Sequence, residues 1–143
     1  MKLSTRVRYG VRAMIELAKQ PDKKPVPLRV LAKNQQISIK YLEQMVTALK
    51  IGGLLESVRG AEGGYRLNKP ANKITAWDIY NVLDTSVDPI ECLHHPCDRE
   101  GNCSAYEVWS EMSESINTIL KSYNLQKLAK RELSLQKKRK GKK

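Results

Sequence analysis

The chain has 143 residues and a formal net charge of +11, with 29% charged and 41% hydrophobic residues. A chain of this length can bury a core, which excludes a miniprotein that needs disulfides to fold. It has no apolar run of the ~18 residues that a membrane-spanning helix needs, and no signal-type segment at its amino terminus. We therefore expect a cytoplasmic protein that is not embedded in a membrane.

Charge is distributed unevenly along the chain. Residues 1–70 carry 14 Lys/Arg against 5 Asp/Glu, a balance of +9, and residues 71–125 carry 3 against 9, a balance of −6. Residues 126–143 carry 9 against 1, a balance of +8. A basic segment beside an acidic one indicates two tasks, and the basic segment suits a polyanion. Nucleic acid is the first expectation and an anionic membrane surface the second.

The first elements in chain order are helices. Residues 2–19 place one apolar stripe at helical spacing, and the prolines that follow end this helix. A short helix over 28–34 comes next, and Ser38 is a good N-cap for another helix up to residue 50. That helix directs a polar face outward. Its members are Ser38, Lys40, Tyr41, Glu43, Gln44 and Thr47.

A β-hairpin is expected after this helix. Residues 54–58 and 65–67 are short alternating segments on either side of the glycine-rich stretch 59–64. Arg59 and Gly60 stand at the expected tip. Helices followed by such a hairpin are the components of a winged helix-turn-helix.

The second half of the chain is predicted to be helical around a loop. Thr75 and Asp78 form a capping-box pattern for a helix over 75–84. From 104 to 123 apolar residues recur every three to four positions, which is typical of a helix that pairs with a partner, the alternative being a helix that covers the body of the domain. The final stretch is rich in lysine and is expected to be disordered.

These elements predict a mainly α protein with a small β-hairpin. We divide it into a winged helix-turn-helix domain (1–84), a cysteine-rich loop (85–103), a dimerisation helix (104–125) and a disordered basic tail (126–143). Helix-turn-helix proteins bind DNA as dimers on two half-sites, so we expect a homodimer on a palindromic operator of double-stranded DNA.

The outer face of the 38–50 helix is the candidate DNA-reading surface. Gln44 suits adenine, while Ser38 and Tyr41 suit phosphates. Glu43 is repelled by phosphates, so it either filters operator sequence or forms a surface ion pair with Lys40. Arg59 on a narrow glycine-rich turn suits the minor groove, although an ordinary turn arginine is the alternative.

All three cysteines and both histidines lie in ECLHHPCDREGNC, residues 91–103. The spacing C-x4-C-x5-C lacks the C-x2-C knuckles of a structural zinc site. A thiol–disulfide switch needs only two of the three thiols. A loop with these spacings suits an iron–sulfur cluster held by Cys92, Cys97 and Cys103. No catalytic set is present, so we do not expect an enzyme.

The sequence resembles the IscR/NsrR/CymR-like bacterial winged-helix transcription regulators. The resemblance covers roughly residues 1–123 and rests on MKLSTRVRYG, SIKYLEQMVTAL, VRGAEGGYRL and the three cysteines. The cysteine loop is most similar to that of the iron–sulfur cluster regulators of the IscR type. The resemblance implies a repressor-type regulator that controls iron–sulfur cluster assembly genes through a bound cluster, most simply 2Fe–2S.

Two positions depart from the pattern that the resemblance implies. Tyr106 stands where IscR-type regulators have a histidine ligand, and Arg8 stands where the nitric-oxide sensors have an aspartate ligand. The fourth cluster ligand is therefore open, with His94, His95 and Glu107 as candidates. The alternative function is a thiol-redox or metal-responsive regulator or accessory protein without a cluster.

Overall fold

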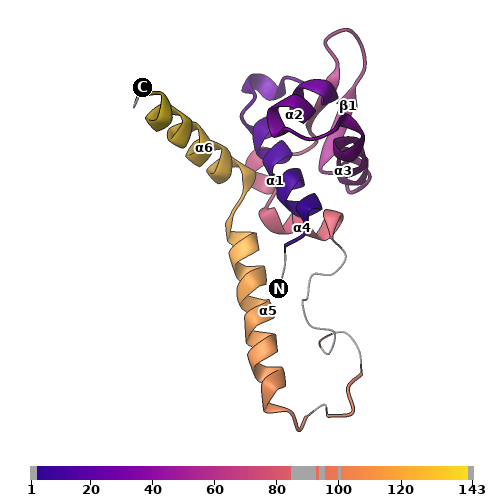
Figure 1. The fold of residues 1–143 in the computed structure, drawn as a ribbon, viewed down its shortest axis with the longest axis vertical. Helices are drawn as coiled ribbons and strands as arrows, with labels where there is room; N and C mark the ends of the chain where they lie inside the picture. Colours follow the sequence, from indigo (N-terminus) through magenta and orange to yellow (C-terminus); the bar gives the residue numbers. More distant parts are fainter. Residues whose placement is uncertain (1–2, 85–92, 94–95, 100, 142–143) are drawn as a thin grey trace.

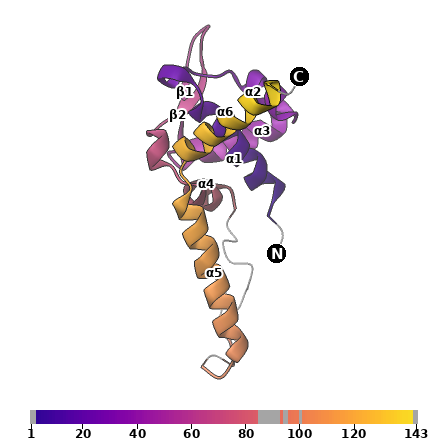
Figure 2. The ribbon, with the colours of Figure 1, turned by 90° about the vertical axis from the view of Figure 1, so that its left-hand side faces the viewer.

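The computed structural model describes residues 3–84, 93, 96–99 and 101–141. Its helices and strands in chain order are α1 (Thr5–Ala18), the 3-10 turn η1 (Pro21–Lys23), α2 (Leu28–Gln35), α3 (Ile39–Ile51), β1 (Leu55–Val58), β2 (Gly64–Leu67), the 3-10 turn η2 (Ala71–Lys73), α4 (Ala76–Leu83), α5 (Ser104–Ser122) and α6 (Leu125–Lys140). Figures 1 and 2 show α1–α4 and the hairpin as one body from which α5 projects, while α6 lies against α1.

Side-chain caps explain where the helices begin. The Ser4 hydroxyl accepts from the Val7 N–H at the start of α1, and the Ser38 hydroxyl accepts from the Tyr41 N–H at the start of α3. Thr75 and Asp78 form the expected capping box of α4. These bonds satisfy amide groups that have no partner inside a helix, so each cap fixes the entry of its helix.

The turn between α2 and α3 is tight because Gln36 adopts a left-handed backbone conformation with φ 56°. The N–H of Ile37 then donates to the Ala32 carbonyl at 3.1 Å, which closes the end of α2. Only three residues separate the two helices. They form the helix-turn-helix unit.

One hydrophobic core joins these helices. The side chains with essentially no exposed surface come from α1 to α4, from the segment before α4 and from α6: Met14, Leu31, Leu42, Met45, Leu49, Ile74, Ile79 and Leu125. Gly10 allows α1 and α4 to approach closely, since a Cβ at that position would lie 2.1 Å from Leu83 Cδ1. Deleting apolar groups at such positions costs both transfer free energy and a cavity.

The hairpin follows α3 directly and completes a winged helix-turn-helix. Strands β1 and β2 pair antiparallel, with Val58 opposite Gly64 and Glu56 opposite Arg66. Gly64 lies against the chain before α2, where a Cβ would meet the Val26 carbonyl oxygen at 2.3 Å. The mainly α architecture with a small β-hairpin is therefore confirmed.

The disordered tail predicted for residues 126–143 is wrong over most of its length, since α6 is helical from Leu125 to Lys140. Asn124 caps this helix by accepting from the Lys127 N–H. Leu125 and Ala129 are buried, and the Leu125 N–H donates to the Ile74 carbonyl at 2.8 Å. The many charged residues of this segment dominate its composition, but Leu125 and Ala129 form a short apolar stripe that packs on the core.

The predicted dimerisation helix ends slightly earlier than residue 125. Helix α5 stops at Ser122, because Asn124 forms a β-bridge with Thr75 and the Ala76 N–H donates to the Tyr123 carbonyl.

Among the described residues, no helix is both long and apolar enough to cross a membrane.

Candidate functional site

The polar face of α3 lies outward as predicted. Leu42, Met45, Val46 and Leu49 are buried beneath it. On the outer side, four residues are exposed: Ser38, Lys40, Glu43 and Gln44. Tyr41 on the same side is half-buried. Ser38 also caps the helix, with its hydroxyl 3.1 Å from the Tyr41 N–H. The candidate reading surface therefore belongs to a helix whose opposite side is buried in the core.

Glu43 does not form the surface ion pair that was its alternative interpretation. Within the described part of the chain, the ion pairs are Lys19–Glu132 and Arg66–Glu56, and Glu43 takes part in neither. An exposed carboxylate on this face can accept from a cytosine amino group and is repelled by phosphates. Both the acceptance and the repulsion would act on any DNA duplex that lies against this face of α3.

Tyr41 is held by residues of α1 that the sequence analysis did not identify. The Thr5 and Tyr41 hydroxyl oxygens are 3.0 Å apart. The Tyr9 ring meets the Tyr41 ring edge-on, with centroids 6.2 Å apart, and the Arg12 guanidinium carbon lies 5.3 Å from the Tyr9 centroid. The available signal was spacing, because these three α1 residues recur at helical intervals beside the apolar stripe.

The hairpin presents Arg59 in the turn between β1 and β2. Arg59 is exposed, and Gly60 follows it with φ 110°, a conformation that favours glycine. The strands are tied by the Arg66–Glu56 pair, and the Lys50 ammonium donates to the Ser57 hydroxyl at 2.9 Å. The Lys50–Ser57 contact fixes the hairpin, which we call the wing (residues 55–67), to the end of α3. Arg59 at its tip is exposed.

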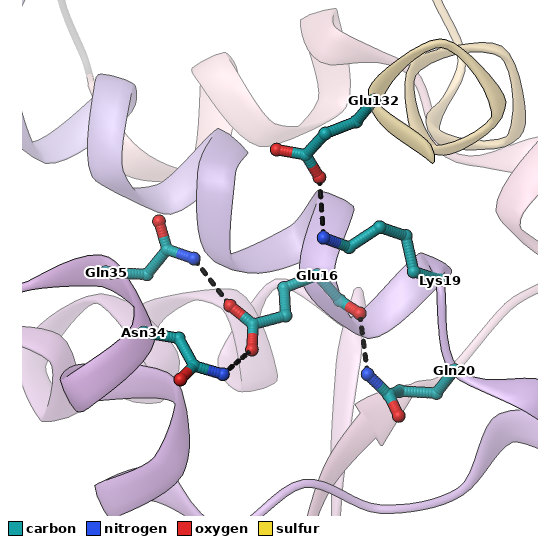
Figure 3. A network of polar contacts seen from close by, with 6 residues as sticks. All are labelled: Glu16, Lys19, Gln20, Asn34, Gln35 and Glu132. Carbon is teal, nitrogen blue, oxygen red and sulfur yellow. Dashed lines mark hydrogen bonds and ion pairs between the residues drawn. The ribbon is translucent and has the colours of Figure 1, made fainter. Parts of the chain in front are cut away.

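A buried carboxylate anchors α2 to α1. Glu16 is 6% exposed, and its two oxygens accept from the side-chain amides of Asn34 and Gln35 (Figure 3). One turn further along α1, Lys19 pairs with Glu132 of α6 at 2.8 Å. A buried carboxylate needs such partners. The helix-turn-helix unit therefore rests on α1 at Glu16 and, through Tyr41, at Thr5 and Tyr9.

The cysteine site is only partly described. Cys92 and both candidate histidine ligands, His94 and His95, lie outside the described residues. Cys97 is exposed and Cys103 is half-buried, and neither forms a disulfide. Among the described residues, no three His, Cys, Asp or Glu side chains gather as a metal site.

Two of the three described candidate donors lie at the start of α5. Cys103 is the residue before the helix, and Glu107 is the acidic residue of its first turn. Soft thiolates suit iron, and negatively charged groups are stabilised next to a helix amino terminus. The thiols of Cys97 and Cys103 and the carboxylate of Glu107 are of the chemical types that can ligate iron.

Helix α5 leaves apolar side chains in solvent. Val108 and Ile119 of α5 are 57% and 58% exposed, and Tyr123, directly after the helix, is 51% exposed, while Ser113 is the one buried residue of α5 among those described. A cavity of about 520 Å³ opens where α5 leaves the body. Its walls are mostly apolar, and they include Val7, Val11, Tyr80, Leu120 and Tyr123.

Known proteins share this arrangement over nearly the whole chain. The family model described as Rrf2, iron-dependent transcriptional regulator, matches residues 3–131. The transcriptional regulator IscR of Xenorhabdus nematophila is 36% identical over 133 residues, 92% of this chain and 81% of that protein.

Two solved structures have the same fold. CymR, the global cysteine regulator of B. subtilis, matches with a TM-score of 0.78 and 38% identity over 91% of this chain and 97% of that one. T. potens IscR matches with a TM-score of 0.78 and 36% identity over 92% of this chain and 88% of that one. These relatives are regulators rather than enzymes, in agreement with the expectation from sequence. The chain belongs to the Rrf2 family of transcriptional regulators.

Proposed function

We propose that this regulator binds a palindromic operator in the cytoplasm as a homodimer and reads it with α3 and the wing. The observation that carries the proposal is the exposed polar face of α3 on a buried apolar face. A helix of this size fits the major groove, where Lys40, Glu43 and Gln44 would meet base edges and phosphates. Arg59 and Gly60 would enter the adjacent minor groove.

The homodimer rests on α5. Its exposed apolar side chains would be costly to leave in water, and a second copy of the helix would cover them. The cavity at the base of α5 continues this surface, since Leu120 and Tyr123 belong to both. Two reading heads related by a two-fold axis require a palindromic operator.

The signal that we propose is an iron–sulfur cluster, most simply 2Fe–2S, held by Cys92, Cys97 and Cys103. The family description as iron-dependent regulators and the relatives named IscR support it. His94, His95 or Glu107 would supply the fourth ligand. A single non-thiolate ligand would make the cluster easier to lose, which suits a sensor of iron supply or oxidation.

The cluster would act on DNA binding through α5, because Cys103 directly precedes this helix. A change at the loop would alter how the two α5 helices pack and thus the separation of the two α3 helices. The regulated genes would include those for cluster assembly, and repression is the simplest mode for an operator-binding dimer.

A second candidate is a thiol-responsive regulator without a cluster. The observation in its favour is that the structural match named a global cysteine regulator is as close as the match to IscR. Cys97 and Cys103 carry free thiols, and an exposed thiol can be oxidised. In this case two of the three cysteines would be sufficient for the response.

One experiment separates the two candidates. The protein is purified without oxygen, its iron and acid-labile sulfide are measured, and single Cys→Ala variants are compared. Stoichiometric iron and sulfide that every single variant loses support the cluster. Zinc in place of iron, or iron retained after any one substitution, contradicts it, and DNA binding that still responds to oxidant then supports the thiol switch.

A further inference from the structure

The contacts of Tyr41 extend the DNA-facing surface beyond α3 and the wing. We define the α1–α3 cluster as Thr5, Tyr9, Arg12 and Tyr41. It joins the amino-terminal halves of two helices that are distant in sequence, through one hydroxyl contact of 3.0 Å, one edge-to-face ring pair and one cation above a ring. Both tyrosines are half-buried and pack their rings against the core, whereas Thr5 and Arg12 are exposed.

Either hydroxyl of the Thr5–Tyr41 pair can donate, and one of the two directions suits a phosphate partner. When the Thr5 hydroxyl donates to the Tyr41 oxygen, the Tyr41 proton stays free for an acceptor outside the protein. A phosphate oxygen accepts such a bond, and tyrosine is a common phosphate contact in protein–DNA complexes. The edge-on Tyr9 ring restricts the Tyr41 ring, so its hydroxyl is oriented before DNA arrives.

Arg12 supplies the charge next to this hydroxyl. Its guanidinium lies above the Tyr9 ring, and no carboxylate of the described residues is within ion-pair distance of it. The segment from Thr5 to Ile15 contains no acidic residue. Arg12 also lines the cavity at the base of α5, but the residue is exposed, and a guanidinium without a carboxylate partner pairs well with phosphate oxygens.

We propose that the α1–α3 cluster is a DNA-backbone contact in which Tyr41 and Arg12 bind phosphates while Thr5 and Tyr9 act as positioning residues. The proposal rests on the DNA binding stated above and adds α1 to the surface that meets the duplex. It assigns roles to Thr5, Tyr9 and Arg12.

A double-mutant cycle tests the hydroxyl pair. The probe is a duplex that the parent protein selects from a randomised library. Thr5→Val and Tyr41→Phe are each expected to weaken its binding by about threefold to tenfold, the usual effect of losing one hydrogen bond. The double variant should bind the probe as tightly as the more weakly binding single variant does, because Thr5 acts through the Tyr41 hydroxyl.

The matched control for this cycle is Thr118→Val, since Thr118 is an exposed threonine on the distant helix α5. It should bind the probe like the parent. Losses that multiply in the double variant, or a Thr5→Val effect no larger than that of Thr118→Val, would overturn the positioning role. Melting temperatures within the range of the parent exclude unfolding as the cause of any loss.

The salt dependence of binding tests Arg12. The slope of log K against log salt should fall in magnitude by about one for Arg12→Gln, on specific and scrambled duplexes alike, because one phosphate contact is lost. Arg131→Gln removes an exposed arginine from α6 and should leave the slope unchanged. Tyr9→Phe keeps the ring and should bind like the parent, whereas Tyr9→Leu should weaken binding. An unchanged slope for Arg12→Gln overturns the phosphate contact.

This inference and the proposed function fail in different ways. If the parent binds selected and scrambled duplexes equally and Arg59→Ala changes nothing, the proposed function itself is wrong. If Arg59→Ala loses binding but the cluster variants do not, only the role of α1 is wrong.

Discussion

The two halves of this molecule differ in how far they bury their apolar side chains. In the helix-turn-helix half, α3 buries Leu42 and Met45 completely and exposes a polar face. In the carboxy-terminal half, α5 exposes Val108 and Ile119 by more than half of their surface. The first half fills its own core, while α5 leaves its apolar side uncovered in the single chain, and the proposed dimer would cover it.

Polar contacts differ in the same way. The helix-turn-helix half contains a buried carboxylate with two amide partners, a capping box and two cross-element hydrogen bonds at the wing and at Tyr41. These contacts position α2, α3 and the hairpin relative to α1. Helix α5 instead contacts mainly α4 at its base and then leaves the body. Its geometry in the regulator is therefore open to change by a partner or a ligand.

The largest effect is expected for a core truncation in the first half. Leu42→Ala removes a fully buried side chain of α3 and should lower the free energy of unfolding by about 2–5 kcal/mol. Ile39→Ala on the same helix changes a half-exposed residue and should alter it by about 0.5 kcal/mol or less. Urea denaturation at fixed protein concentration measures both. Equal losses would contradict the difference in burial.

The next effect sharpens the contrast at α5. Trp109→Ala should weaken self-association by about 2 kcal/mol or more if this ring is an anchor of the dimer, while the unfolding of the body changes little. Sedimentation equilibrium at several concentrations measures the dissociation constant. Glu114→Gln, at an exposed position on the other side of α5 from Val108 and Ile119, is the control. A monomeric parent at micromolar concentration would end the assignment of α5 to a dimer.

A third prediction concerns the wing. Arg59→Ala should weaken operator binding by about 1–3 kcal/mol if the guanidinium contacts the minor groove, because the exposed side chain would then lose a specific DNA contact. Binding titrations at one stated salt concentration measure this. Lys69→Ala, an exposed cation beyond the hairpin, is the matched control. Equal losses in both variants would indicate only a general charge effect.

A fourth prediction concerns the range of sites rather than affinity. Glu43→Ala should bind duplexes that the parent rejects, with little change on the best site, since the carboxylate repels sequences that offer it no amino group. Selection from a randomised library followed by sequencing measures the preference. Glu62→Ala removes an exposed carboxylate from the wing turn and should leave the preference unchanged. Identical preferences of parent and Glu43→Ala would reduce Glu43 to a surface charge.

The sequence predicted the helix-turn-helix half well because its signals are local. Ser38 and Thr75 are caps in the structure, and the apolar spacing of α3 matches its buried side. The Thr5–Tyr41 contact was missed since it joins residues 36 positions apart, and no local pattern encodes such a pair. Helix α6 was missed because its charged residues dominate the composition, whereas Leu125 and Ala129 decide its packing.

The candidate site divides along the same line. Residues on one helix face, such as Lys40 and Gln44, share a surface because helical spacing places them together. The cysteine spacing predicts a common ligand but does not determine which fourth donor approaches it, because that depends on the path of a loop. Among the predicted ligands, only Cys97, Cys103 and Glu107 are described.

The smallest predicted effect tests whether α6 belongs to the folded body. Lys19 and Glu132 form a partly exposed pair at 2.8 Å between α1 and α6, and such pairs contribute about 0.2–1 kcal/mol. Lys19→Met keeps most of the aliphatic stem and removes the charge, so the free energy of unfolding should fall by an amount in this range at low salt. The same substitution in a Glu132→Gln background should cost less, and 1 M salt should remove most of the difference. Lys23→Met, an exposed lysine in η1, is the control and should show no such coupling. A coupling energy of zero at low salt would mean that the packing of Leu125 and Ala129, rather than this pair, holds α6 on α1.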